Sequence, residues 1–307
     1  MDIVKLPSEL VEIQDNDKVK VKYCGNVIEV MYSEHTSNGG YITKVDKDHY
    51  IDNQTGELKQ FDHNENRSQD LQNVAKSMQQ GRDIINTNVV NCDNCLWVTL
   101  TYRENQRNTK KVLKDFENFN ARLRSQFGKY EYITCLEPQQ RGAWHLHCIL
   151  IFDHKAPFIE NKIIADAWKQ GFVNINKLTS VDNVGAYLSA YLCDVEASEM
   201  SETDIKNIGK QHIVEKTIVD RTDGKEKTKR FVKGARLYLY PSGTHIFRWS
   251  KGIKKPTVEY SEYKKAKEKV SSAKLTYSKV VLLNDSDNEF NNTLKYEYYN
   301  SSIPKRN

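Results

Sequence analysis

The segment from residue 96 to residue 177 has the most regular hydrophobic pattern in the chain, and its order of elements restricts the fold more than any other feature. Short apolar, β-branched runs predict strands, and apolar residues at every third or fourth position predict helices. The predicted strands cover residues 96–102, 130–137, 144–152 and 172–177, and the predicted helices cover residues 108–126 and 157–168. This order is the split β-α-β arrangement of a ferredoxin-like or RRM-like fold. We therefore expect an α+β protein whose antiparallel sheet carries helices on one face and leaves the other face for a site.

The composition changes on both sides of this block. Residues 1–65 alternate apolar and polar positions between turn-forming residues, which predicts a β-rich lead-in. A helix is expected over residues 67–88, with Ser68 as its N-cap. Beyond residue 200 the chain is rich in basic residues. We divide the chain into a small β-rich N-terminal region (1–65), a central domain (66–200) and a basic C-terminal region (201–307).

Charge, cysteine usage and hydropathy restrict the environment of the protein. The formal net charge of +5 is compatible with a nucleic-acid partner, although many soluble proteins are as basic. The 6 cysteines are scattered, and two fall in strands expected to be buried, which suits a reducing cytosol. No apolar run approaches the roughly 20 residues that cross a bilayer, and the N-terminus lacks a signal-peptide core. We expect a soluble, cytoplasmic protein with no membrane partner.

Two histidines lie on one face of the predicted strand 144–152. Because alternate side chains of a strand share a face, His145 and His147 point the same way. Two neighbouring imidazoles on a rigid strand are a ready pair of metal ligands. A turn before this strand would pair it with the preceding one, so that Glu137 supplies a carboxylate beside the imidazoles. The alternative is that both histidines are ordinary polar residues of the sheet surface.

Two tyrosines share one face of a further predicted helix, which covers residues 181–195. Tyr187 and Tyr191 are four residues apart, about 6 Å along the helix axis. A tyrosine hydroxyl, with a pKa near about 10, is a poor nucleophile unless a cation stabilises the charge that develops during attack. Packed near a metal site, this pair would attack phosphodiesters and leave phosphotyrosyl links. The alternative is a pair of amphipathic tyrosines at the boundary between a helix and the core.

Basic residues alternate with aromatic residues between positions 225 and 256. Such a surface suits a nucleic acid, because the charges neutralise phosphates and the rings stack on bases. The alternative for any one of them is a solvated charged surface. The residues that we expect to contact DNA are Arg141, Lys229, Arg230, Lys233, Arg236, Arg248, Lys251, Lys254 and Lys255.

Residues 97–195 resemble the catalytic domain of the HUH endonucleases that initiate rolling-circle replication. The matching motifs, in chain order, are the strand 98–102, His145-Leu-His147 preceded by Glu137, and Tyr187-Leu-Ser-Ala-Tyr191. Within that superfamily the chain resembles bacterial plasmid, integrative-element and phage replication proteins related to the filamentous-phage gene II protein. The stretches 137–147 and 248–256, and the helix leading to residues 84–88, carry this narrower resemblance, which runs over most of residues 66–300. It implies that the central domain, 66–200, is catalytic.

The resemblance implies a nickase that acts on a single-stranded or hairpin origin of replication. Glu137, His145 and His147 would bind Mg²⁺ or Mn²⁺, and Tyr187 or Tyr191 would form a 5′-phosphotyrosine. The freed 3′-hydroxyl would then prime synthesis by a host DNA polymerase. The protein would act in the cytoplasm of a bacterial host that carries a plasmid or another mobile element.

One departure, the order of the motifs and one absence refine this interpretation. Relatives often carry a lysine near the tyrosines where this chain has Ala190 and Asp194, which leaves open which tyrosine attacks first. The tyrosines follow the histidines, as in replication initiators and some transposases and unlike conjugative relaxases. No P-loop sequence occurs, so unwinding of a duplex would require a host helicase.

Two alternative functions stay open at this stage. One is a single-strand transposase of the HUH superfamily, which shares the chemistry and differs in its substrate. The other is a non-catalytic nucleic-acid-binding protein whose RRM-like sheet stacks bases on aromatic residues. The sheet face in question is expected to carry His145, His147, Thr99 and Thr101 rather than a pair of aromatic residues, which favours the enzyme.

Overall fold

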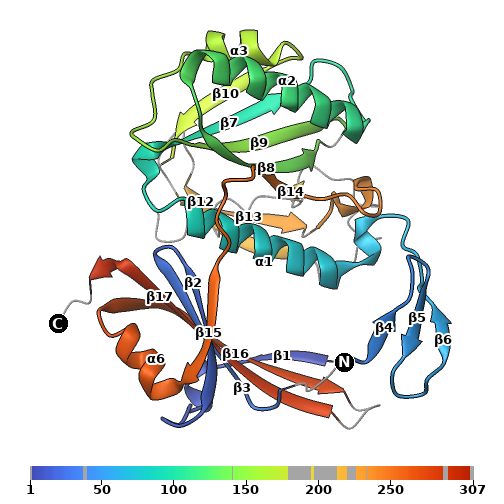
Figure 1. The fold of residues 1–307 in the computed structure, drawn as a ribbon, viewed down its shortest axis with the longest axis vertical. Helices are drawn as coiled ribbons and strands as arrows, with labels where there is room; N and C mark the ends of the chain where they lie inside the picture. Colours follow the sequence, from blue (N-terminus) through green and yellow to red (C-terminus); the bar gives the residue numbers. More distant parts are fainter. Residues whose placement is uncertain are drawn as a thin grey trace. The chain divides into compact units, whose positions relative to one another are not determined.

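The computed structural model describes residues 2–36, 40–139, 141–178, 195–196, 213–219, 226–232, 234–285 and 290–304 (Figure 1). The chain is a mixed α+β protein, and every strand pairing in these ranges is antiparallel. Contacts divide it into two compact units, one of Met1–Asn64 with Lys255–Asn307 and one of Glu65–Lys254. This division differs from the three consecutive segments that we expected, because the end of the chain returns to the N-terminal region.

The first unit is built on a six-stranded sheet with the strand order β1-β16-β17-β3-β2-β15. The N-terminal region is β-rich, as expected, and its sheet is completed by strands from the end of the chain. Its strands are β1 (Asp2–Leu6), β2 (Lys18–Cys24), β3 (Val27–Ser33), β15 (Thr257–Glu262), β16 (Ala273–Asp285) and β17 (Phe290–Pro304). The helix α6 (Tyr263–Lys269) buries Ala266 against Val19 and Val21 of this sheet. The first unit also contains a 3-10 turn, η1 (Ser8–Leu10), and a small sheet of β4 (Ile42–Lys44), β5 (His49–Asp52) and β6 (Leu58–Gln60).

The second unit contains a five-stranded sheet with the strand order β10-β7-β9-β8-β14. Its strands are β7 (Cys95–Thr101), β8 (Glu131–Pro138), β9 (Trp144–Ile151), β10 (Val173–Lys177) and β14 (Phe247–Trp249). Its helices are α1 (Leu71–Asn88), α2 (Thr109–Phe127) and α3 (Asn161–Trp168). A further sheet has the order β11-β13-β12, formed by β11 (Val195–Glu196), β13 (Glu226–Val232) and β12 (Ile213–Val219). The 3-10 turns of this unit are η2 (Arg67–Gln69), η3 (Cys92–Asn94) and η6 (Leu237–Leu239).

The order β7-α2-β8-β9-α3-β10 confirms the strand and helix order expected from the hydrophobic pattern. Asn108 caps α2 by accepting hydrogen bonds from the backbone N–H groups of Lys110 and Lys111. The expected N-cap of α1 was wrong, since Asp70 rather than Ser68 accepts the hydrogen bond of the first turn. No helix among the described residues is both long enough and apolar enough to cross a membrane.

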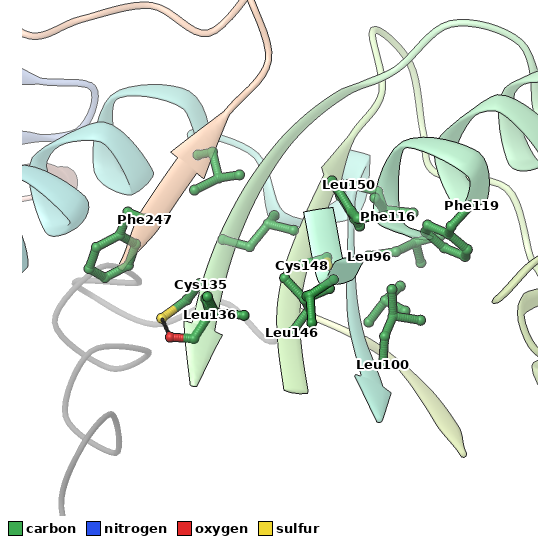
Figure 2. Close-up of a cluster of buried hydrophobic side chains, with 14 of the residues drawn as sticks. Leu96, Leu100, Phe116, Phe119, Cys135, Leu136, Leu146, Cys148, Leu150 and Phe247 are labelled. Atoms are coloured by element: carbon green, nitrogen blue, oxygen red, sulfur yellow. Dashed lines mark hydrogen bonds between the residues drawn. The ribbon is translucent and has the colours of Figure 1, made fainter. Parts of the chain in front are cut away.

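The helices α2 and α3 pack on one face of the five-stranded sheet. Alternation along β9 places Leu146, Cys148 and Leu150 on this face, and all three are buried. Figure 2 shows them beside Leu96 and Leu100 of β7 and the rings of Phe116 and Phe119 from α2. The apolar stripe of α2 supplies the rest of the contact, because its buried residues recur at three- or four-residue spacing. This layer is a conventional hydrophobic core that holds β9 rigidly in the middle of the sheet.

The helix α1 packs on the opposite face, which we expected to be free of helices. Ile85 of α1 lines a small cavity together with Trp97, Ile133 and Ile149, whose side chains lie on that face. Phe247 of β14 lines the same cavity. The expectation of helices on one face therefore holds for α2 and α3 but not for α1. The hydrophobic end of this face is covered by α1, and its other end carries the two histidines.

Candidate metal centre

The pairing of β8 with β9 brings Glu137, His145 and His147 together. Glu137 lies directly opposite His145 in the register, and His147 is the next residue of β9 on the same face. The Oε2 atom of Glu137 lies 2.8 Å from Nε2 of His145 and 2.8 Å from Nε2 of His147. The two Nε2 atoms are 3.0 Å apart. These three side chains could hold a metal ion.

The cluster is largely withdrawn from solvent. The side chain of Glu137 is 5% exposed, and those of His145 and His147 are 13% and 17% exposed. Burial alone would raise the pKa of Glu137, but its hydrogen bonds to the two histidines and its electrostatic interaction with them lower that pKa below its usual range. Glu137 is therefore a carboxylate at neutral pH, which is the form that binds a cation.

The spacing of the three ligand atoms suits an octahedral ion. Ligands about 2.1 Å from an octahedral metal lie about 3 Å from one another when they are adjacent. The observed separations of 2.8, 2.8 and 3.0 Å are close to that value. Three ligands on one side of an ion leave its other positions for water or a substrate oxygen. The residues present therefore fit a divalent cation that binds a substrate.

The second nitrogen of each histidine determines which atom is free for a metal. Nδ1 of His147 lies 3.3 Å from Oγ1 of Thr99, and the ring stacks on Trp97 with 5.3 Å between ring centroids. A proton on Nδ1 would leave the lone pair of Nε2 for a cation. Nδ1 of His145 is buried and has no hydrogen-bond partner within the described part of the chain. Thr99 and Trp97 thus orient one of the two imidazoles.

Arg236 completes the surroundings of Glu137. Its Nη1 donates a hydrogen bond to Oε1 of Glu137 over 2.7 Å, so that Oε1 is engaged while Oε2 faces the histidines. Tyr240 anchors the same segment, because its hydroxyl donates to the carbonyl oxygen of Leu136 over 2.8 Å. The Tyr240 ring also packs against Trp144. Arg236 therefore fixes the direction in which the carboxylate presents its second oxygen.

The position of Arg236 differs from our expectation of a DNA contact. The residue directly precedes the 3-10 turn η6. The side chain of Arg236, a predicted DNA contact, is 18% exposed and paired with Glu137. This pairing was not predicted from the sequence, because 99 residues separate the partners and no motif joins them.

The other predicted DNA contacts are distributed over several elements. Arg141 is exposed in the turn between β8 and β9, where its Nη2 donates to the carbonyl oxygen of Tyr102. Arg248 is exposed on β14, at the edge of the sheet that carries the cluster. Lys229 and Arg230 belong to β13, and Lys251 and Lys254 are exposed in the loop that follows β14. Lys255 belongs to the first unit. Tyr187, Tyr191 and Lys233 lie outside the described residues, so their roles stay predictions.

A comparison with known protein families identifies this region. Residues 95–196 match a family model of replication-associated proteins, the family of ORF2 and the filamentous-phage gene II protein. This match confirms the resemblance to the gene II protein family over the segment that contains Glu137, His145 and His147. No curated protein and no solved structure matches the chain. The second unit thus carries a domain of a family of DNA replication proteins.

Proposed function

We propose that this protein initiates rolling-circle replication as a metal-dependent, site-specific nickase of single-stranded DNA. The convergence of Glu137, His145 and His147 on two paired strands is the observation that carries the proposal. The family match over residues 95–196 supports it, because proteins of this kind start replication of phages and plasmids. The strand order β10-β7-β9-β8 is also the order of a ferredoxin-like sheet, the core that we propose this domain shares with HUH endonucleases.

The metal that we propose for the cluster is Mg²⁺ or Mn²⁺. Both ions favour octahedral coordination with oxygen ligands, and Mn²⁺ also accepts imidazole nitrogen. When bound, the ion would polarise the scissile phosphate and offset the charge that builds on its non-bridging oxygens. The contribution of the chain is to hold three ligand atoms on one side, with Arg236 and Thr99 fixing two of them. This arrangement would position one phosphate of a single strand against the sheet.

Tyr187 and Tyr191 are the nucleophiles that we propose, on the strength of the family resemblance. The tyrosine oxygen would form a bond to phosphorus while the bond from phosphorus to the 3′-oxygen breaks. The phenol loses its proton to solvent, and the departing 3′-oxygen takes up a proton to become a hydroxyl group. The phosphotyrosyl link keeps the 5′ end on the protein for later rejoining, and the 3′-hydroxyl primes a host DNA polymerase. A host helicase would open the duplex in the bacterial cytoplasm.

The basic residues would hold the DNA backbone beside this centre. The predicted contacts that we retain are Arg141, Lys229, Arg230, Lys233, Arg248, Lys251, Lys254 and Lys255. Arg236 is better explained as the partner of Glu137, because its guanidinium is already paired there. Each retained contact to a phosphate would release counterions, so binding should weaken steeply as the salt concentration rises.

A covalent-adduct assay tests the proposal. The protein is incubated with single-stranded origin DNA of its own replicon and Mn²⁺ or Mg²⁺, and the linked peptide is mapped by mass spectrometry. We expect an adduct on Tyr187 or Tyr191 that disappears with EDTA and in His145→Ala. The matched control is His154→Ala, since His154 is an exposed histidine just beyond β9 and outside the cluster. Intact DNA binding without any adduct or nick, on several origin substrates and with both metals, would leave only a binding protein.

A further inference from the structure

One row of paired residues connects the candidate metal centre with the edge of the five-stranded sheet. Glu137 of β8 lies opposite His145 of β9, and His145 lies opposite Thr101 of β7. The edge strand β10 pairs with β7, with Val173 opposite Leu100. This register continues one residue further, because the Thr101 N–H donates to the carbonyl oxygen of Phe172 over 2.9 Å.

Phe172 therefore belongs to the face that carries the metal cluster. Residues directly opposite one another in antiparallel strands share a face. With about 4.8 Å between neighbouring strands, the backbone of Phe172 is about 10 Å from that of His145. The exposure pattern agrees with this placement, since Val173 is buried towards α2 and α3 while Phe172 and Asn174 are exposed.

The ring of Phe172 is exposed although its backbone is held firmly. Phe172 is 78% exposed, so its ring is accessible to a partner on the face that carries the cluster. The preceding Gly171 runs close against β7, and a Cβ atom there would meet the Thr101 carbonyl oxygen at 2.6 Å. The Thr101 hydroxyl also donates to the Phe172 carbonyl oxygen over 2.7 Å. The fold thus fixes the backbone of Phe172 beside β7 and leaves its ring largely exposed.

The surroundings of the ring favour a nucleobase as its occupant. Thr101 and Thr99 continue the face towards the histidines, and Asn174 is the next exposed residue of β10. A single flat ring among hydroxyl and amide groups is a poor docking site for an apolar protein surface. It suits a base, which stacks on an aromatic face whatever its sequence and keeps polar edges that need hydrogen bonds.

We propose that Phe172 stacks on a base of the DNA strand whose phosphate lies at the Glu137, His145 and His147 cluster. The inference rests on the proposed function for the identity of the strand. At about 3.4 Å per nucleotide, the separation of about 10 Å places the stacked base within about three nucleotides of the scissile phosphate. Phe172 would then determine which nucleotide of the DNA strand lies at the metal cluster. The basic residues would hold the DNA backbone whichever nucleotide lies there.

The test compares binding of a fluorescein-labelled, mixed-sequence single strand of about 20 nucleotides in EDTA, where no cleavage occurs. We expect Phe172→Ala to weaken binding about tenfold and Phe172→Trp to bind as tightly as the wild type. Phe158→Ala is the matched control, because Phe158 is 83% exposed but follows β9 at the end of the sheet away from the histidines. We expect that control to stay within about twofold of the wild type.

A second readout separates stacking from a general loss of affinity. A 2-aminopurine placed at successive positions of an origin strand should be quenched at one position by the wild type and not by Phe172→Ala. Equal binding and equal quenching by the wild type and Phe172→Ala would overturn the inference, even if the protein nicks DNA. If instead Phe172→Ala loses both tight DNA binding and quenching while neither metal supports nicking, the stacking proposal is supported and the nickase proposal is wrong.

Discussion

The two faces of β9 show how one strand can serve stability and chemistry separately. Leu146, Cys148 and Leu150 are buried against α2 and α3, where any well-shaped apolar side chain would stabilise the sheet. His145 and His147 alternate with them and meet a buried carboxylate. The stability that the first face provides depends on the volume of its side chains. Metal binding on the second face depends on the positions of individual atoms. Substitutions on the first face should therefore change the free energy of unfolding, and those on the second should change metal binding.

The largest effect is expected on the core face. Leu150→Ala removes a fully buried side chain and should lower the free energy of unfolding by about 2–5 kcal/mol. Urea denaturation followed by circular dichroism measures this change. At low temperature, where the variant is folded, its affinity for Mn²⁺ should stay within about threefold of the wild type. If folded Leu150→Ala lost as much Mn²⁺ affinity as a variant that lacks a metal ligand, the two faces would not have separate roles.

The next largest effect is expected on the ligand face. His147→Ala removes one of three ligands and should weaken Mn²⁺ binding by about 100-fold or more, measured by isothermal titration calorimetry. Its metal-free melting temperature should fall less than that of Leu150→Ala, because the side chain removed is 17% exposed rather than fully buried. His154→Ala, outside the cluster, should bind Mn²⁺ as the wild type does. Undiminished binding by His147→Ala would mean that the metal sits elsewhere.

A smaller effect is expected from a substitution that changes only how one metal ligand is held. Arg236→Lys keeps the positive charge beside Glu137 but loses the planar fork that holds its Oε1. We expect about tenfold weaker Mn²⁺ binding, at the lower end of the effect of residues that orient metal ligands. Because the charge is unchanged, electrostatic repulsion cannot explain such a loss. An affinity equal to that of the wild type would show that Arg236 only docks its own segment.

Sequence reasoning predicted what depends on local periodicity. The alternation in β9 separated the core residues from His145 and His147, and the short connection between β8 and β9 predicted the contact with Glu137. The family resemblance from the same motifs was confirmed over residues 95–196. These features are local because each involves one element or two elements joined by a short turn.

What sequence reasoning missed depends on contacts between distant residues. Arg236 pairs with Glu137 across 99 residues, and the last strands of the chain complete the sheet of the N-terminal region. Neither contact leaves a periodic signal. The strand that was predicted to begin at Phe172 begins at Val173, and the face on which the Phe172 ring lies follows only from the register between β10 and β7. The packing of α1 on the second face was missed for the same reason.

Anomalous scattering from crystals grown with Mn²⁺ locates the metal. We expect a single strong peak about 2.2 Å from Nε2 of His145, Nε2 of His147 and Oε2 of Glu137. This peak should disappear in crystals of His147→Ala. If the protein forms the DNA adduct in Mn²⁺ while its anomalous peak lies away from these three side chains, the cluster is not the metal site.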